Sequence, residues 1–213
     1  GPGGLGHGVF SALQKAGAAL PAVPTLPQAV AQRWGERAEA IAAGLAEPPQ
    51  LDLTLRDSEP TSEWAERLGG LSLAPGHVRL PRVTAVAELP GFAEGAWWVQ
   101  DFAASLPARL LGPGDGRRAL DLCAAPGGKA LQLASAGWPV TALDVSDKRL
   151  DRLRENLART GLSAKIWIAD ALTWEPPEPF DAILLDAPCT ATGTCRRHPD
   201  VLHRIGSRQI AEM

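Results

Sequence analysis

The chain has 213 residues, of which 45% are hydrophobic and 21% are charged, and its formal net charge is −3. This length and composition are typical of a folded protein with one large or two small domains, and they exclude a chain that is mostly disordered. The slightly acidic balance argues against nucleic-acid binding over the whole surface, although a local basic patch is compatible with it.

The first 47 residues predict a helical connector. Two helices are expected, at 9–20 and 26–46, because a proline-rich segment separates two runs of small apolar residues. Charged residues are dispersed along the second helix, which indicates a solvated face and not a binding stripe.

Residues 48–112 predict a small α+β module. Apolar and polar residues alternate where the first strand is expected, and a pair of glycines, Gly69 and Gly70, ends the helix that follows. Modules of this kind contact RNA or act as spacers, and the pattern does not choose between the two. The expected elements are strands at 51–56, 72–73 and 77–80, a helix that begins at Thr61, and a helix at 102–111 after Trp97 and Trp98.

From residue 113 to residue 213 the pattern predicts an α/β domain with a doubly wound parallel sheet. Its second helix is the best marked, because Leu150, Leu153 and Leu157 form one apolar stripe. Only four strands are visible, so the last one is expected to leave an exposed apolar edge. The expected elements are strands at 118–122, 139–144, 164–169 and 180–185, and helices at 128–136 and 147–160.

Residues 120–130, with the sequence LDLCAAPGGKA, join a buried strand to a Pro-Gly-Gly turn and a helix. Such a turn lets the backbone approach a nucleotide-type cofactor closely. Acidic residues stand where the later strands should end, at Asp144, Asp170 and Asp186, and Asp144 has the spacing of a ribose ligand. The glycine pattern of a dinucleotide site is absent, which favours S-adenosylmethionine, a cofactor without phosphates. Lys129 does not belong to a P-loop, because Ala130 follows it in place of Ser or Thr.

Three motifs together resemble a known family: DLCAAPGGK at 121–129, LDAPC at 185–189 and RRHPD at 196–200. They are similar to the Sun-type RNA cytosine-5 methyltransferases and closest to the RsmB enzymes of 16S rRNA, over residues 48–213. The resemblance implies a Rossmann-like, S-adenosylmethionine-dependent methyltransferase core, here apparently truncated. It also implies that the preceding module contacts RNA and that the N-terminal connector is the tail of a NusB-like domain.

The resemblance further implies a set of site residues. Asp144 would contact the ribose and Asp170 would lie near the adenine. Arg196 and Arg197 would contact RNA phosphates, although scattered charge on a solvated face explains them as well. The cofactor contacts would come from Cys123, Ala124, Ala125, Pro126, Gly127, Gly128, Lys129, Asp144, Asp170 and Asp186.

Cysteine chemistry explains why a thiol matters here. Cytosine C5 is a weak nucleophile, so a thiolate adds at C6, C5 takes the methyl group, a base removes the C5 proton, and the thiolate leaves. In this family the Pro-Cys cysteine assists product release, and the nucleophile belongs to a Thr-Cys-Ser motif that does not occur in this sequence. Cys189 is therefore either an auxiliary thiol, which we favour, or the nucleophile itself. We expect the chain alone to be inactive.

The other two cysteines give weaker indications of a function. Cys123 is expected to pack as a small apolar residue, and Cys195 suggests no function. Three cysteines without paired spacing indicate free thiols, no metal and a reducing compartment. Because no apolar run is long enough to span a bilayer, we expect a cytoplasmic protein, without membrane contact and monomeric. Two rival functions remain open: a non-catalytic rRNA-binding or assembly module, and a nicotinamide-dependent dehydrogenase.

Overall fold

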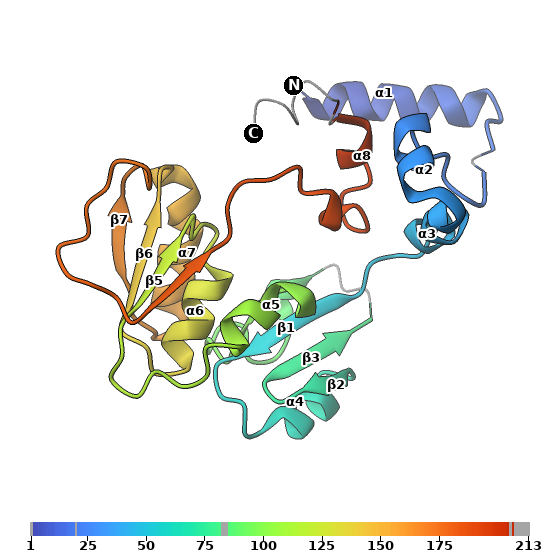
Figure 1. The fold of residues 1–213 in the computed structure, drawn as a ribbon. Coiled ribbons are helices and arrows are strands. Elements are labelled where there is room, and N and C mark those ends of the chain that lie inside the picture. The colour runs from blue at the N-terminus through green and yellow to red at the C-terminus, as the bar shows by residue number, and fades with distance from the viewer. Residues whose placement is uncertain (1, 20, 82–84, 205, 207–213) are drawn as a thin grey trace. The chain divides into compact units, whose positions relative to one another are not determined.

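The computed structural model of the chain describes residues 2–19, 21–81, 85–204 and 206 (Figure 1). Its contacts divide the chain into two units, and each is described by itself. One unit combines Gly1–Pro48 with Thr190–Met213, and the other is Pro49–Cys189. The second unit contains both β-sheets. None of the helices in the described residues is long and apolar enough to cross a membrane.

The first unit is helical. The helix expected at 9–20 begins earlier, at Pro2, and ends earlier, at Lys15. It ends there because Gly17, two residues later, adopts a positive φ of 62°. The helix expected at 26–46 is interrupted at Gly35, whose φ of 54° does not fit a regular α-helix. The elements are α1 (Pro2–Lys15), α2 (Gln28–Trp34), η1 (Gly35–Arg37), α3 (Ala38–Ala46), η3 (Thr192–Thr194) and α8 (Val201–Arg204).

The first sheet of the second unit is antiparallel, with strand order β2-β3-β1-β4. Leu53 lies at its centre, opposite Val78 on one side and Val99 on the other. Both tryptophans of the adjacent pair are buried, on opposite faces: Trp97 in the core of this sheet and Trp98 in the core of the next. The elements are β1 (Leu51–Leu55), α4 (Thr61–Arg67), β2 (Leu71–Ala74), β3 (His77–Leu80), η2 (Val86–Glu88), β4 (Trp97–Val99) and α5 (Phe102–Arg109).

The second sheet is parallel, with strand order β7-β6-β5-β8. This order confirms the doubly wound α/β fold. The strand order reverses between β5 and β8, and such a switch point is where an open parallel sheet binds its ligand, beyond the carboxyl ends of the strands. The elements are β5 (Ala119–Leu122), α6 (Gly128–Ser135), β6 (Val140–Asp144), α7 (Asp147–Thr160), β7 (Lys165–Ile168) and β8 (Ala182–Leu185).

Helix α7 has the bounds expected from the sequence. The side chain of Ser146 accepts a hydrogen bond from the backbone N–H of Arg149 at its start, and Gly161 adopts a left-handed conformation at its end. Its predicted stripe of leucines is buried in one core with residues of β5, β6 and α6. The helix therefore holds the carboxyl end of β6 firmly in place.

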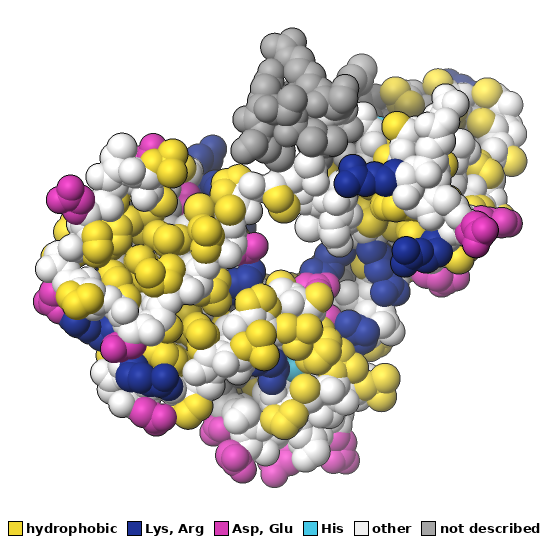
Figure 2. All heavy atoms as spheres, viewed as in Figure 1, with side chains coloured by type: hydrophobic (Ala, Val, Ile, Leu, Met, Phe, Trp, Pro, Cys, Tyr) yellow, Lys and Arg dark blue, Asp and Glu magenta, His cyan; other side chains and the backbone are white. Residues whose placement is uncertain are grey.

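One face of β8 is exposed. Leu184 is buried in the core, whereas Ile183 and Leu185, which point to the opposite face, are 60% and 61% exposed. Figure 2 shows hydrophobic side chains gathered over this sheet. The sequence predicted an exposed apolar edge at this strand; β8 stands last in the strand order, and the apolar side chains that are exposed lie on one of its faces.

The two sheets of the second unit are joined through the end of α7. The Arg159 guanidinium lies 4.2 Å from the centre of the Phe92 ring. It donates hydrogen bonds to the carbonyl oxygens of Phe92 and Trp97, at 2.7 and 3.0 Å. At Gly95, a Cβ atom would lie 2.0 Å from the Arg159 carbonyl oxygen, so only glycine allows this approach.

Candidate active site

The loop after β5, residues 123–129, carries the Pro-Gly-Gly turn into α6. Gly127 has a φ of 107°, and a Cβ atom there would lie 2.5 Å from Cδ1 of Leu153, so both conformation and space require glycine. Cys123 also has a positive φ, 59°. Ala124 and Ala125 are buried, whereas Pro126 is exposed. The loop is therefore packed against α7 on one side and open to solvent at its tip.

Asp144 fastens this loop to the neighbouring strand. It is the last residue of β6, and its side chain is 2% exposed. One carboxylate oxygen accepts a hydrogen bond from the N–H of Ala125 at 3.1 Å, and the other accepts one from Ser146 at 2.9 Å. Arg149 adds to the same arrangement: it donates to the Ala125 carbonyl oxygen at 2.9 Å and lies 3.8 Å from Asp144. The sequence had not singled out Arg149, whose only signal is its position one turn into α7.

A second contact spans the switch point. The Nζ atom of Lys129, near the start of α6, donates to Oδ2 of Asp186 at 2.7 Å, immediately after β8. Cys189 follows three residues later in the chain and is exposed. The loop after β5 and the Asp-Ala-Pro-Cys segment are thus brought together.

Asp121 is a site residue to which sequence reasoning assigned no role. It lies within β5 and is 1% exposed, although its neighbours Leu120 and Leu122 are apolar. Burial raises the pKa of its carboxyl to about 7; Lys129 opposes this effect and Asp186 adds to it. Its Oδ2 atom has no hydrogen-bond partner within the described residues. A carboxylate inside an apolar strand was the signal that could have found it.

The three cysteines differ in setting. The thiol of Cys123 is partly buried, and burial together with the charge of Asp144 raises its pKa. A thiol of this kind stays protonated at neutral pH, which suits packing better than nucleophilic attack. Cys189 is exposed after β8, and Cys195 is partly buried next to η3 in the first unit. Of the thiols in the second unit, Cys189 is the one open to a reactant.

The remaining predicted residues are exposed. Asp170 is exposed after β7, the outer strand, and its Oδ1 accepts a hydrogen bond from the N–H of Leu172 in its own turn. Arg196 and Arg197 are exposed between η3 and α8 and belong to the first unit. The structure therefore joins the loop at 123–129 to Asp144 and Asp186 by direct contacts.

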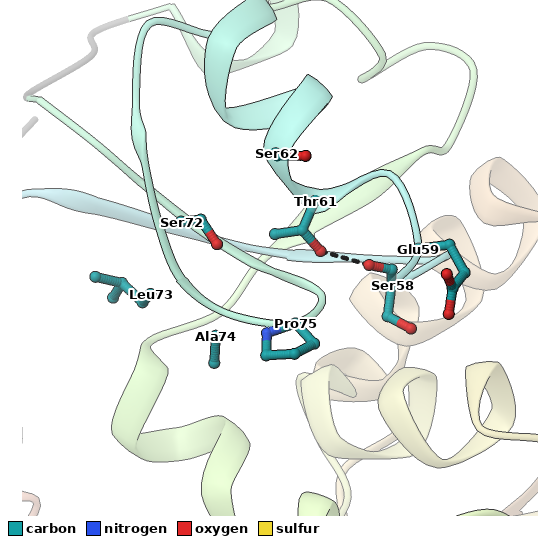
Figure 3. A pocket seen from close by; sticks show the side chains of 8 residues that line it. All are labelled: Ser58, Glu59, Thr61, Ser62, Ser72, Leu73, Ala74 and Pro75. Atoms are coloured by element: carbon teal, nitrogen blue, oxygen red, sulfur yellow. Dashed lines mark hydrogen bonds between the residues drawn. The ribbon is translucent and has the colours of Figure 1, made fainter.

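A separate hollow lies on the antiparallel sheet (Figure 3). It encloses about 430 Å³ beside the start of α4. Thr61 donates to the Ser58 carbonyl oxygen at 2.5 Å and accepts from the N–H of Gly76, so its hydroxyl is occupied within the fold. The hollow is away from the strand ends that carry the candidate site. Across the ranges that the structure describes, His, Cys, Asp and Glu side chains form no group of three or more that could hold a metal ion.

The charges around the loop at 123–129 bear on which cofactor fits. Three carboxyl groups lie around it, those of Asp121, Asp144 and Asp186, and two of them pair with Lys129 and Arg149. The loop also lacks the glycine pattern that cradles the pyrophosphate of a nicotinamide dinucleotide. It suits a ligand with a sulfonium, an ammonium and ribose hydroxyls, which are the groups of S-adenosylmethionine.

The fold and this arrangement of residues define a Rossmann-like, S-adenosylmethionine-dependent methyltransferase core. Residues 108–213 match the family model described as 16S rRNA methyltransferase RsmB/F. The chain belongs to the Sun/RsmB methyltransferase family, as its three motifs had suggested.

Individual proteins support this assignment. The ribosomal RNA small subunit methyltransferase B of Klebsiella pneumoniae is 40% identical over 195 residues, which are 85% of this chain and 45% of that protein. The chain thus spans about half the length of the curated relatives that it matches.

Two solved structures are also similar. PH0851 has a TM-score of 0.78 and 25% identity and covers 94% of this chain and 52% of its own. A methyltransferase homologue from Pyrococcus horikoshii has a TM-score of 0.63 and 28% identity, with coverage of 82% and 60%.

Proposed function

We propose that the protein to which this chain belongs methylates C5 of cytosine in RNA, with S-adenosylmethionine as methyl donor and small-subunit rRNA as substrate. The observation that carries the proposal is the meeting of the loop at 123–129 with Asp144 and with the Asp186 segment at the switch point of the sheet. Relatives named ribosomal RNA small subunit methyltransferase B support the choice of substrate.

Within this scheme the residues of the chain have distinct tasks. The loop at 123–129 and Asp144 bind and orient the cofactor, with Asp144 on the ribose and Asp170 beside the adenine. Bound there, the cofactor supplies an electrophilic methyl group. Cys189 stands beside the target base, where its exposed thiol assists release of the methylated product.

RNA binding involves further parts of the chain. Arg196 and Arg197 contact backbone phosphates, and the antiparallel sheet at 48–112 contributes a second RNA surface. The target cytosine has to leave its stack, because a thiol reaches C6 only on an unpaired or flipped base. The three domains at 1–47, 48–112 and 113–213, a monomeric state and a reducing, cytoplasmic setting are parts of the same proposal.

Binding and transfer assays test the proposal. Calorimetric titration of the 213-residue chain with S-adenosylhomocysteine should show binding, and titration with NAD should show none. Incubation with radiolabelled S-adenosylmethionine and small-subunit rRNA should give no methylated cytosine, because the chain lacks a Thr-Cys-Ser motif. If transfer occurs and is lost in Cys189→Ser, Cys189 is the nucleophile and the auxiliary role is wrong.

The rival function as an rRNA-binding module predicts a different result. Such a module would bind RNA with the same affinity in the presence and absence of S-adenosylhomocysteine, and Asp144→Ala would bind RNA as the parent chain does. A cofactor-binding chain that fails to bind rRNA fragments would instead contradict the proposed substrate.

A further inference from the structure

The candidate site contains a buried carboxyl group, that of Asp121, whose hydrogen-bonding capacity is not fully satisfied within the described residues. Lys129 donates to Asp186, which is 64% exposed, while the Asp121 carboxyl lies beneath them at 1% exposure. The hydrogen bond that reaches Asp121 comes from the backbone N–H of Ala130, in the first turn of α6. One carboxylate oxygen is left without a partner among the described residues. A buried polar atom of this kind calls for a physical explanation.

Lys129 is the cation that acts electrostatically on the Asp121 carboxyl, and it lies next to Ala130, whose N–H donates to that carboxyl. The Lys129 ammonium is close enough to influence Asp121 electrostatically, yet its ion pair within 4 Å is with Asp186. A lysine ammonium has three donors on a flexible four-carbon stem, so it can exchange one acceptor for another by rotation. Its side chain is 16% exposed and therefore lies between the buried acid and the exposed one.

We propose that Asp121 is a positioning residue: its buried carboxylate is an inner partner for Lys129, to which the ammonium turns when another cation occupies Asp186. In the present arrangement Lys129 points outward, to Asp186. When Asp186 pairs with a cationic group of a ligand, Lys129 moves inward, and Asp121 becomes ionised by releasing its proton to solvent. That the cation is the ammonium of the methyl donor rests on the proposed function.

The charges around Asp121 agree with this exchange. Lys129 from α6 favours its ionised form, whereas Asp186 after β8 and Asp144 at the end of β6 oppose it. Burial brings its pKa to about 7, so a modest change in the position of one ammonium changes its protonation at neutral pH. With Lys129 turned inward, Lys129 and Asp121 would form an ion pair below the ligand. The Asp186 carboxylate would then pair with the cationic group of the ligand.

A double-mutant cycle on the unliganded chain tests the coupling without any ligand. The titration of Asp121 is followed by ¹³C NMR of aspartate carboxyl carbons, with its signal assigned by its loss in Asp121→Asn or Asp121→Glu. Removing the outer partner, in Asp186→Asn, should lower the Asp121 midpoint by about one pH unit. In the Lys129→Gln background, Asp186→Asn should lower the Asp121 midpoint by less than half as much, because only the loss of the repulsive Asp186 charge remains.

The lowering of the Asp121 midpoint in the two backgrounds shows whether Lys129 turns toward Asp121. Equal lowering in the two backgrounds means that Lys129 does not turn, and the proposal is then wrong. Lys129 and Asp186 are both partly or largely exposed, so their substitutions should leave the fold intact. Asp115, an exposed residue in a turn of the same unit, provides an internal control signal that should not move.

Addition of S-adenosylhomocysteine tests the ligand step. Saturation should lower the Asp121 midpoint in the parent chain and lower it by less than half as much in Lys129→Gln. If the parent chain binds this ligand and the midpoint stays where it was, the ligand-driven exchange is refuted. If the chain does not bind it at all, the proposed function fails, whereas the mutant cycle still reports whether Lys129 and Asp121 are coupled.

Discussion

The Asp144 carboxylate and the backbone N–H of Ala125 are hydrogen-bonded at 3.1 Å, across the gap between β6 and the loop after β5. The other carboxylate oxygen holds the N–H of Ser146. A single side chain therefore fixes both the start of α7 and the loop at 123–129.

We expect Asp144→Ala to weaken binding of S-adenosylhomocysteine at least about tenfold and to lower the free energy of unfolding by about 2 kcal/mol, because two N–H groups lose their acceptor. Calorimetric titration and urea denaturation measure these effects. Asp151→Ala, which removes an exposed carboxylate of α7, should change neither. Unaltered binding by the Asp144 variant would remove this residue from the cofactor site.

Gly127→Ala should destabilise the chain by about 2–4 kcal/mol, because its Cβ would overlap both Cδ1 and Cβ of Leu153, at a φ of 107°. Gly137→Ala is the matched control: Gly137 has a φ of 83° but nothing within 4 Å of an added Cβ, so the cost should be about 1 kcal/mol. Urea unfolding measures both. Equal losses of stability in the two variants would mean that Leu153 moves aside and that steric overlap with it does not determine the conformation of the loop.

Stability should fall in acid because of His77. Burial lowers its pKa to about 4, from 6.5. Thr54 donates its hydroxyl hydrogen to Gln100, so the contact at 3.2 Å between Thr54 and the imidazole is a donation from Nδ1 of His77. The Nε2 atom has no hydrogen-bond partner in the described residues and lies 3.8 Å from Asp52. The neutral ring is therefore the form that the fold holds.

Since the folded state binds the His77 proton more weakly than the unfolded state, this residue's contribution to stability is complete above pH 6.5 and is lost between pH 6.5 and 4. We expect a slope on the order of 1 kcal/mol per pH unit in this window. Thermal denaturation as a function of pH measures it. In His77→Asn, which keeps a donor for Thr54, the slope should decrease; an unchanged slope would assign the acid sensitivity to other groups.

The thiols should differ in reactivity. Cys189 is exposed, whereas Cys123 is partly buried and its pKa is raised by burial and by Asp144. At neutral pH, iodoacetamide should therefore alkylate Cys189 at least about tenfold faster than Cys123. Peptide mass spectrometry over time measures the two rates. Cys189→Ser provides the control for assignment, and faster labelling of Cys123 would contradict its packing role.

The parallel sheet was predictable because its signals are local. Glycines, a leucine stripe and acids after apolar runs each define an element or its end, and α7 follows its prediction from Asp147 to Thr160. The helices before residue 48 were less predictable. Gly17 and Gly35 end their helices through positive φ values that composition alone does not reveal in an alanine-rich segment.

The candidate site was only partly predictable for a similar reason. The loop at 123–129 and the acids at strand ends follow from spacing along the chain. The roles of Arg149 and Asp121 depend on distances between elements: Arg149 reaches back from α7 to Ala125, and Asp121 is buried beneath Lys129. Such contacts exist only once the strands are aligned, so no pattern of residue types announces them.

The close approach of Gly95 to Arg159, with the guanidinium held over Phe92, leaves no room for a hinge between the antiparallel sheet and the end of α7. The small sheet is therefore held against the end of α7 by direct contacts. If RNA binds on this sheet, as proposed, these contacts set the distance from the sheet to the loop at 123–129, and that distance determines which nucleotide reaches the loop.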